Sequence, residues 1–217
     1  MLEIYNAVIK NPLFKGIAAD DFSKVFRCLS ARTVKYKKGE IIVLSGDDVS
    51  FIGVILYGEI KIIKEDKHGY VSMLTELSVT EMFGEILTCA DIKQFPVTIV
   101  AKLDTEILLL NNEKIITTCT ASCLFHKNLI ENMMRHIAKK NFIQNRKIEI
   151  LSKRSIRERL VCFFEIQRNG AKSFNIPFNR EEMAQYLCVD RSALSNELCK
   201  MRNEGIITFR KNSFTIL

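Results

Sequence analysis

The spacing of hydrophobic residues changes twice along the chain. Residues 1 to 32 carry apolar residues at helical spacing, with one stripe from Phe22 to Leu29. From Thr33 to Leu110 the sequence has short runs rich in Val, Ile, Tyr and Phe, separated by glycine-containing turns. Gly58-Glu59, inside FIGVILYGEIKIIKED, is a candidate tight turn between two strands. Six or more strands at this spacing predict an antiparallel sandwich or barrel.

The period then becomes that of a long helix. Between residues 130 and 151, apolar or amide side chains recur at alternating steps of four and three, with no Pro or Gly between them: Ile130, Met134, Ile137, Asn141, Gln144, Ile148 and Leu151. This heptad stripe predicts a helix that pairs with a second copy of itself, and polar Asn141 and Gln144 would fix the register of a parallel pair. The alternative is a helix that packs on its own domain.

Helix start signals and a short strand pair follow. Ser155 and Asn179 each stand three residues before a glutamate, which predicts capping boxes at two helix starts. Asp190 can cap a third helix, which ends at Gly205. The C-terminal residues predict two strands about a Lys211-Asn212-Ser213 turn. Helix, tight turn, helix and hairpin is the order of a winged helix-turn-helix.

The composition is that of a globular protein without membrane spans. The 217 residues are 47% hydrophobic and 26% charged. Uncharged stretches such as IIVLSG fall short of the roughly 20 apolar residues of a membrane helix, and the N-terminus lacks a signal-peptide layout. We therefore expect a cytoplasmic protein. Seven scattered cysteines without a C-x-x-C pair argue against a disulfide framework, a zinc site and a four-thiolate iron–sulfur site.

The positive charge is concentrated in the C-terminal part. Residues 138 to 217 carry 16 Lys or Arg against 8 Asp or Glu, whereas the first 137 residues carry 16 against 17. A localised basic excess is typical of a protein that binds a polyanion such as nucleic acid, although a solvated surface has the same composition.

The segment NREEMAQYLCVDRSALSNELCKMRNEGIITFRKNSFTI resembles the helix-turn-helix of the cyclic AMP receptor protein and fumarate-nitrate-reduction regulator (Crp/Fnr) superfamily of bacterial transcription factors. KKGEIIVLSGD, LYGEIKI and MFGEI extend the resemblance over nearly the whole chain. It implies an α+β chain with a cyclic-nucleotide-binding-like β-roll (jelly roll) at 1–110, a dimerisation helix at 111–151 and a winged helix-turn-helix at 152–217. It also implies three partners: double-stranded DNA with a palindromic site, a second copy of the chain, and RNA polymerase.

The resemblance assigns DNA contacts to two sets of residues. In such motifs the second helix lies in the major groove. The base-facing set is Arg191, Ser192, Ser195 and Asn196, and the backbone-contacting set is Arg180, Lys200, Arg202, Arg210 and Lys211. The founding members carry glutamate where Ser192 stands and arginine where Asn196 stands, so we expect a different half-site. Cys188 replaces the usual glycine of the turn, which suggests a backbone that tolerates a side chain.

The sensor part matches the nucleotide-binding pattern only in part. Gly84-Glu85 matches the pair that opens a short helix and takes a ribose hydroxyl in nucleotide-binding members. The phosphate-binding arginine is missing, and no arginine occurs from Thr33 to Met134. We therefore expect no cyclic nucleotide, because a buried phosphate needs a paired cation. The expected pocket, for an unknown small effector or for none, comprises Gly84, Glu85, Phe95, Pro96 and Thr98.

No cofactor is evident, and no catalytic motif points to an enzyme. The histidines leave haem binding open. Cys119, Cys123 and His126 share one helix face, as a metal or thiol-switch cluster would, but the favoured interpretation is that the two cysteines pack near the start of the long helix. The sequence thus predicts a homodimeric, effector-regulated DNA-binding transcription regulator with a hinge near Lys153 to Ile156. The alternative is a cyclic-nucleotide-binding regulatory module that acts through protein contacts.

Overall fold

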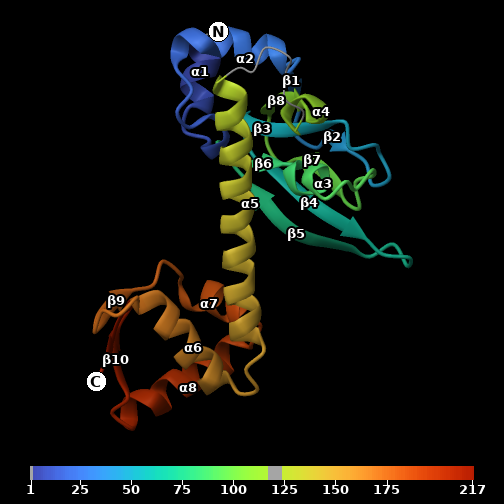
Figure 1. Cartoon of the computed structure of the whole chain (residues 1–217). Helices are drawn as coiled ribbons and strands as arrows, with labels where there is room; N and C mark the ends of the chain where they lie inside the picture. Colours follow the sequence, from blue (N-terminus) through green and yellow to red (C-terminus); the bar gives the residue numbers. More distant parts are fainter. Residues whose placement is uncertain (1, 117–123) are drawn as a thin grey trace. The chain divides into compact units, whose positions relative to one another are not determined.

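A computed structural model describes residues 2–116 and 124–217, which form two compact units, Met1–Ala138 and Lys139–Leu217. Each unit has its own hydrophobic core. Figure 1 shows the helices and strands of both units along the chain. The boundary between the units lies inside a single helix, α5 (Leu124–Leu151). Within the described residues, no helix is long and apolar enough to cross a membrane.

The N-terminal helices cover one face of the first sheet. They are α1 (Leu2–Val8), the 3₁₀ helix η1 (Pro12–Phe14) and α2 (Ala19–Cys28). The helical stripe predicted from Phe22 to Leu29 is buried here and packs with Ile52 and Leu108 of the sheet. The residues that share the apolar face of α2 are therefore the ones that the core buries, as their spacing predicted.

Eight strands form the roll, as two four-stranded antiparallel sheets. The first sheet has the order β1-β8-β3-β6 and the second β2-β7-β4-β5. Their bounds are β1 (Arg32–Tyr36), β2 (Ile41–Val43), β3 (Phe51–Tyr57), β4 (Ile60–Glu65), β5 (Val71–Leu77), β6 (Met82–Phe83), β7 (Thr98–Ala101) and β8 (Thr105–Asn111). This architecture confirms the predicted fold class.

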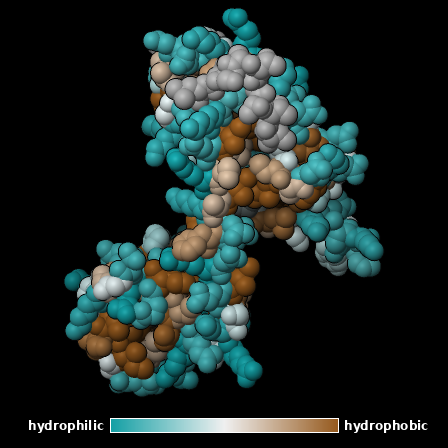
Figure 2. Space-filling view, viewed as in Figure 1, coloured by the Kyte–Doolittle hydropathy of each residue, from teal (hydrophilic) through white to brown (hydrophobic). Residues whose placement is uncertain are grey.

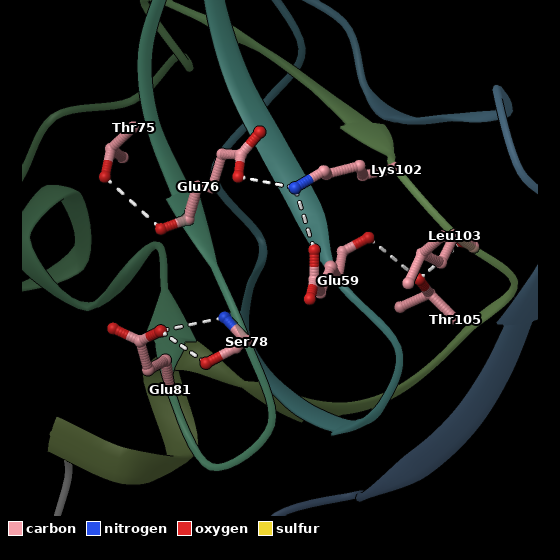
Figure 3. A network of polar contacts seen from close by, with 8 residues as sticks. All are labelled: Glu59, Thr75, Glu76, Ser78, Glu81, Lys102, Leu103 and Thr105. Atoms are coloured by element: carbon pink, nitrogen blue, oxygen red, sulfur yellow. Dashed lines mark hydrogen bonds and ion pairs between the residues drawn. The ribbon is translucent and has the colours of Figure 1, made fainter.

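The Gly58-Glu59 turn joins strands of different sheets. It connects β3 to β4, and these strands do not pair with each other. Gly58 has φ +86°, and a Cβ atom there would lie 2.4 Å from the Asp104 carbonyl oxygen, so only glycine fits. Beside this turn, Lys102 Nζ forms ion pairs with Glu59 at 2.9 Å and Glu76 at 2.6 Å (Figure 3). The turn is thus a corner of the roll rather than a hairpin.

Two short helices and the start of α5 complete the first unit. The short helices are α3 (Glu85–Cys89) and α4 (Asn112–Ile116). Helix α5 buries Phe125, Leu129 and Met133 in the first core. Asn132, also buried, donates hydrogen bonds to the carbonyl oxygens of Leu13 and Lys15, at 3.0 and 2.7 Å. The beginning of α5 is therefore fixed to the sensor unit by both apolar and polar contacts.

The second unit combines the end of α5 with three helices and a small sheet. The helices are α6 (Ile156–Arg168), α7 (Arg180–Leu187) and α8 (Arg191–Asn203), and the antiparallel sheet has the order β10-β11-β9. The strands are β9 (Ser173–Asn175), β10 (Ile207–Arg210) and β11 (Ser213–Ile216). The predicted hairpin is present, with β9 as a third strand that the sequence pattern did not indicate.

Gly53 makes a close contact that tests the packing of the roll. A Cβ atom at Gly53 would lie 2.2 Å from Cζ of the buried Phe83 ring. We predict that Gly53→Ala lowers the free energy of unfolding by about 1–3 kcal/mol, because the ring must move in a filled core. Gly53→Ala combined with Phe83→Leu should recover part of this loss. Denaturant unfolding measures both values; an unchanged midpoint for Gly53→Ala would contradict the packing.

Candidate nucleic-acid interface

Helices α7 and α8 and the turn between them form the helix-turn-helix. Both predicted capping boxes are present, because Ser155 and Asn179 accept hydrogen bonds from the backbone N–H of Glu158 and Glu182. Asp190 occupies the N-cap position of α8, but its side chain makes no capping hydrogen bond, contrary to the sequence expectation. The sequence signals therefore located all three helix starts, but the capping hydrogen bond expected at Asp190 is not formed.

The turn keeps a backbone conformation that favours glycine. Cys188 has φ +52° and ψ +53°, in the left-handed region, and its side chain is exposed. An L-residue in this region carries a steric cost of about 1 kcal/mol. The backbone at Cys188 thus keeps the left-handed conformation that favours glycine, and the side chain is tolerated because it points into solvent.

Two arginines of α6 that the sequence analysis did not single out, Arg157 and Arg159, hold the helix-turn-helix in place. Arg157 donates from Nη1 and Nη2 to the two carboxylate oxygens of Glu204, at 2.7 and 2.8 Å, and from Nε to Glu197 at 2.5 Å. Because Glu197 and Glu204 both belong to the α8 region, one guanidinium from α6 orients that helix at two points. No local signal could reveal these pairs, since the partners lie 40 and 47 residues away.

Arg159, two residues after Arg157 on α6, connects the linker between α5 and α6 to the turn of the helix-turn-helix. Its Nε donates to the Lys153 carbonyl oxygen at 3.0 Å, and its Nη1 donates to the Leu187 carbonyl oxygen at 3.1 Å. Ile150 of α5 is also buried in the second core. The linker at Lys153 to Ile156, expected from sequence as the hinge, is thus held to the helix-turn-helix by these contacts.

The base-facing set is exposed on α8, with one member partly engaged. Arg191, Ser192 and Asn196 are exposed. Ser195 is half-buried, and its hydroxyl donates to the Arg191 carbonyl oxygen at 2.9 Å. Its donor is therefore used within the helix, which leaves the oxygen only as an acceptor.

Arg180 is the most distinctive polar residue of this unit. Its guanidinium lies 5.0 Å from the ring centres of both Phe209 and Phe214, and its Nη2 donates to the Lys211 carbonyl oxygen at 3.1 Å. Burial lowers the pKa of Arg180, although an arginine stays protonated at neutral pH. Its buried Nη1 has no hydrogen-bond partner within the described residues.

Arg180 lines an open groove of about 830 Å³ together with two other cations, Arg191 and Lys211. The groove also contains Glu181, whose carboxylate lies 3.8 Å from Arg191 Nε. A groove lined by three cations is suited to a phosphate group.

The other basic residues named from sequence lie outside this groove. Lys200 is exposed, 4.0 Å from Glu197, and Arg210 is exposed at the end of β10. Arg202 stacks over the Phe209 ring at 5.2 Å. The structure therefore brings three of the predicted contacts together and leaves these three as separate surface cations.

The predicted dimer seam on α5 is partly uncovered. Met134 and Ile148 are 66% and 63% exposed, and Asn141 and Gln144 are exposed between them. The other members, Ile130, Ile137 and Leu151, are partly buried. Figure 2, in the view of Figure 1, shows tan and brown side chains along the middle of α5. The seam thus offers apolar residues that no described residue covers.

The expected effector residues pack tightly within the first unit. Gly84 has φ +85° and precedes α3, whose Glu85 is 2% exposed and lies 3.7 Å from His136 Nε2 of α5. Phe95 is buried and lies 6.1 Å from the Phe51 ring.

At the edge of this region, Thr98 Oγ1 accepts a hydrogen bond from the Ser45 N–H at 3.1 Å, and Pro96 is exposed. Of the cysteine and histidine cluster considered from sequence, Cys119 and Cys123 lie outside the described residues. His126 is buried and lies beside Cys28.

Comparisons with known proteins agree with this arrangement. The cyclic nucleotide-binding domain family matches residues 33–122, and the Crp-like helix-turn-helix domain family matches residues 158–217. A search of curated protein sequences gave no match.

Solved structures show the same fold. The chain is similar to the Thermus thermophilus catabolite activator protein, with 22% identity, 95% of this chain and 94% of that chain covered, and a TM-score of 0.56. It is also similar to DNR from Pseudomonas aeruginosa, with 16% identity, 98% and 92% covered, and a TM-score of 0.52. The c-di-GMP responsive regulator CLP of Xanthomonas campestris shares 16% identity, with 90% and 99% covered and a TM-score of 0.52.

A sensor domain of the cyclic nucleotide-binding type followed by a Crp-like helix-turn-helix defines a DNA-binding transcription regulator with an effector-sensing domain. The chain belongs to the Crp/Fnr family. This family consists of transcription regulators and not of enzymes.

The Arg157 contacts make the stability of the second unit sensitive to acid. The Arg157 guanidinium holds the pKa of Glu204 below its ordinary value of 4.5, so the pair stabilises the fold above that pH and the contribution is lost as pH falls through the lowered pKa. We predict that Arg157→Met lowers the melting temperature at pH 7 and lowers it by less at pH 3. Arg154→Met, an exposed arginine in the linker, is the control. Equal effects of Arg157→Met at both pH values would contradict this assignment.

Proposed function

We propose that this protein is a homodimeric transcription regulator that reads a palindromic DNA site with α8 and receives a small-molecule or chemical signal through its first unit. The observation that carries the proposal is the Arg180 groove. The Arg180 guanidinium packs against two aromatic rings, which restrain its direction, and Arg180 lines a groove together with Arg191 and Lys211. A DNA phosphate in this groove would meet three cations.

Sequence reading is assigned to the exposed residues of α8. Arg191 can donate to guanine O6 and N7, and Asn196 can pair with adenine N6 and N7. Ser192 has a free hydroxyl, whereas Ser195 offers only an acceptor because its hydrogen is used within the helix. Lys200, Arg202, Arg210 and Lys211 would add contacts to the phosphate backbone. RNA polymerase is the further partner that the family resemblance implies, and the site of action is then the bacterial cytoplasm.

A second copy is proposed to cover the seam on α5. Exposed Met134 and Ile148 lie at heptad positions with polar Asn141 between them. Burying these residues against the same stripe of another chain removes apolar area from water, and Asn141 would fix the register. The two recognition helices would then address half-sites about 34 Å apart, one turn of the duplex.

The signal is proposed to differ from a cyclic nucleotide. Three features support this proposal: the sequence has no arginine from residue 33 to 134, Phe95 is buried, and Glu85 lies close to His136. By resemblance, the glutamate at the position of Glu85 binds a ribose hydroxyl in nucleotide-binding relatives. A phosphate bound there would lack the planar, bidentate cation that suits it.

DNA selection with two variants tests the reading function. We predict that selection from genomic fragments returns one symmetric site. Arg180→Ala should weaken binding to this site and to random duplex by a similar factor and reduce the salt slope by about 1. Asn196→Ala should cost about 1–3 kcal/mol on the selected site only, because it removes base contacts.

The matched control is Arg168→Ala. Arg168 pairs with Glu165 on α6 and does not line the groove, so its removal should leave the affinity for both the selected and the random duplex nearly unchanged. Selection without a preferred site, or equal binding by wild type and Asn196→Ala, would rule out the reading function.

Two isoleucines of α5 test the dimer. Ile148 is on the seam, whereas Ile143, 52% exposed, lies about 140° away around the same helix. We predict that Ile148→Asp shifts a micromolar sample from dimer to monomer, because a charge would enter the apolar seam, and that Ile143→Asp leaves the dimer intact. Analytical ultracentrifugation measures both. A wild-type monomer at this concentration would contradict the homodimer.

A further inference from the structure

Three elements of the first unit bring a thiol and an imidazole together. Cys28 is the last residue of α2, His126 lies in the first turn of α5, and Lys114 belongs to α4. The Cys28 sulfur lies 3.8 Å from His126 Nδ1, and His126 Nε2 lies 2.6 Å from the Lys114 carbonyl oxygen. His126 is 3% exposed, whereas Cys28 is only partly buried. An external reagent can therefore approach this pair from the side of the thiol.

The contact with the Lys114 carbonyl oxygen decides which nitrogen of the His126 imidazole carries the hydrogen. A carbonyl oxygen can only accept a hydrogen bond, so His126 Nε2 carries the hydrogen. A neutral imidazole has one N–H, which leaves a lone pair on Nδ1 directed at the Cys28 thiol. The stacked Phe125 ring, with its centre 5.8 Å away, also restrains the imidazole plane. A cysteine is activated by a base within reach of its sulfur and by a group that orients this base. Cys28, His126 and the Lys114 carbonyl oxygen have this arrangement.

The nearby charges also favour a thiolate. Lys114 Nζ donates to Ser30 Oγ at 2.8 Å, two residues beyond Cys28, and Arg27 directly precedes Cys28. The other charges of these elements largely pair with one another, because Lys24 lies 2.9 Å from Asp21 and Lys127 lies 3.9 Å from Glu131. Cations near a sulfur stabilise the thiolate over the thiol.

We propose that Cys28 is an activated thiol that peroxides oxidise, with His126 as its base, and that it is a redox-sensitive modification site of the sensor unit. His126 takes the thiol proton, and the Cys28 sulfur attacks one peroxide oxygen as the O–O bond breaks. The leaving hydroxide takes the proton from His126 and becomes water. Sulfur is oxidised by two electrons to a sulfenic acid, and the peroxide is reduced.

The oxidised residue would lie where α2, α4 and α5 meet. A sulfenic oxygen adds volume and polarity to a side chain that packs against the first core. Because His126 belongs to the first turn of α5, the change would act on the helix that carries the proposed dimer seam. This consequence for DNA binding rests on the proposed function, whereas the thiol chemistry does not.

The test measures alkylation of each cysteine in the full-length protein. Iodoacetamide is added over a range of pH, and mass spectrometry gives the rate at each site. His126→Gln keeps an N–H donor for the Lys114 carbonyl oxygen but has no basic nitrogen. We expect the rate at Cys28 to fall about tenfold at pH 7 in this variant and to match wild type near pH 9.5, where a thiol ionises unaided. Exposed Cys89 in the same samples is the internal reference and should not change.

A second measurement needs no variant. In the wild-type protein, the pH midpoint of Cys28 alkylation should be lower in the native state than in urea. An equal midpoint, an unchanged rate in His126→Gln, or a thiol that reacts only after a chelator removes a bound metal would each overturn the proposal.

The regulatory consequence is tested separately in a Cys188→Ser, Cys199→Ser background, which removes the two exposed thiols of the helix-turn-helix. One equivalent of hydrogen peroxide should change the affinity for the selected DNA site at least threefold, and adding Cys28→Ser should abolish the change. If this background binds the site but peroxide has no effect, the regulatory role is wrong. If it binds no DNA while Cys28 still shows the lowered midpoint, the DNA-binding proposal has failed and the thiol site stands.

Discussion

Helix α5 links the two units, and the arrangement of the rest of the structure depends on which of its residues are buried. Its apolar residues are buried at both ends: Leu129 and Met133 in the first core, and Ile150 in the second core. Between residues 138 and 146 only Lys140 is partly buried, so neither core supports this stretch. Most helical stability in proteins comes from packing of an apolar face. The helix is thus anchored at both ends and exposed in the middle, and the exposed Met134 and Ile148 flank this stretch at the positions where the proposed second copy would pack.

Features encoded by residues near one another could be predicted from the sequence. The capping boxes at Ser155 and Asn179, the end of the long helix at Leu151 and the turn of the C-terminal hairpin all depend on neighbours within a few residues. The pattern of short strands predicted an antiparallel sandwich or barrel, but not which strands pair. Gly58-Glu59 is a turn between two strands, as predicted, yet these strands belong to different sheets, because pairing is decided by distant chain segments.

Side-chain contacts across the sequence were beyond prediction for the same reason. Arg157 reaches Glu204 across 47 positions, and Cys28 reaches His126 across 98. Ser195 looked like an ordinary base-reading hydroxyl, but a hydrogen bond to the preceding turn uses its donor. The charge count located the basic part of the chain, although it could not distinguish Arg180, partly buried against two rings, from the exposed cations around it.

The sensor unit connects to α5 through its own side chains. In nucleotide-binding relatives, by resemblance, the glutamate after the paired glycine takes a ribose hydroxyl. In this chain the corresponding Glu85 is 2% exposed, and its carboxylate lies 3.7 Å from His136 of α5. A buried carboxylate keeps such a neighbour because leaving a charge unpaired is costly. An effector that bound Glu85 would therefore lie close to His136, so this carboxylate is a direct route from the β-roll to α5.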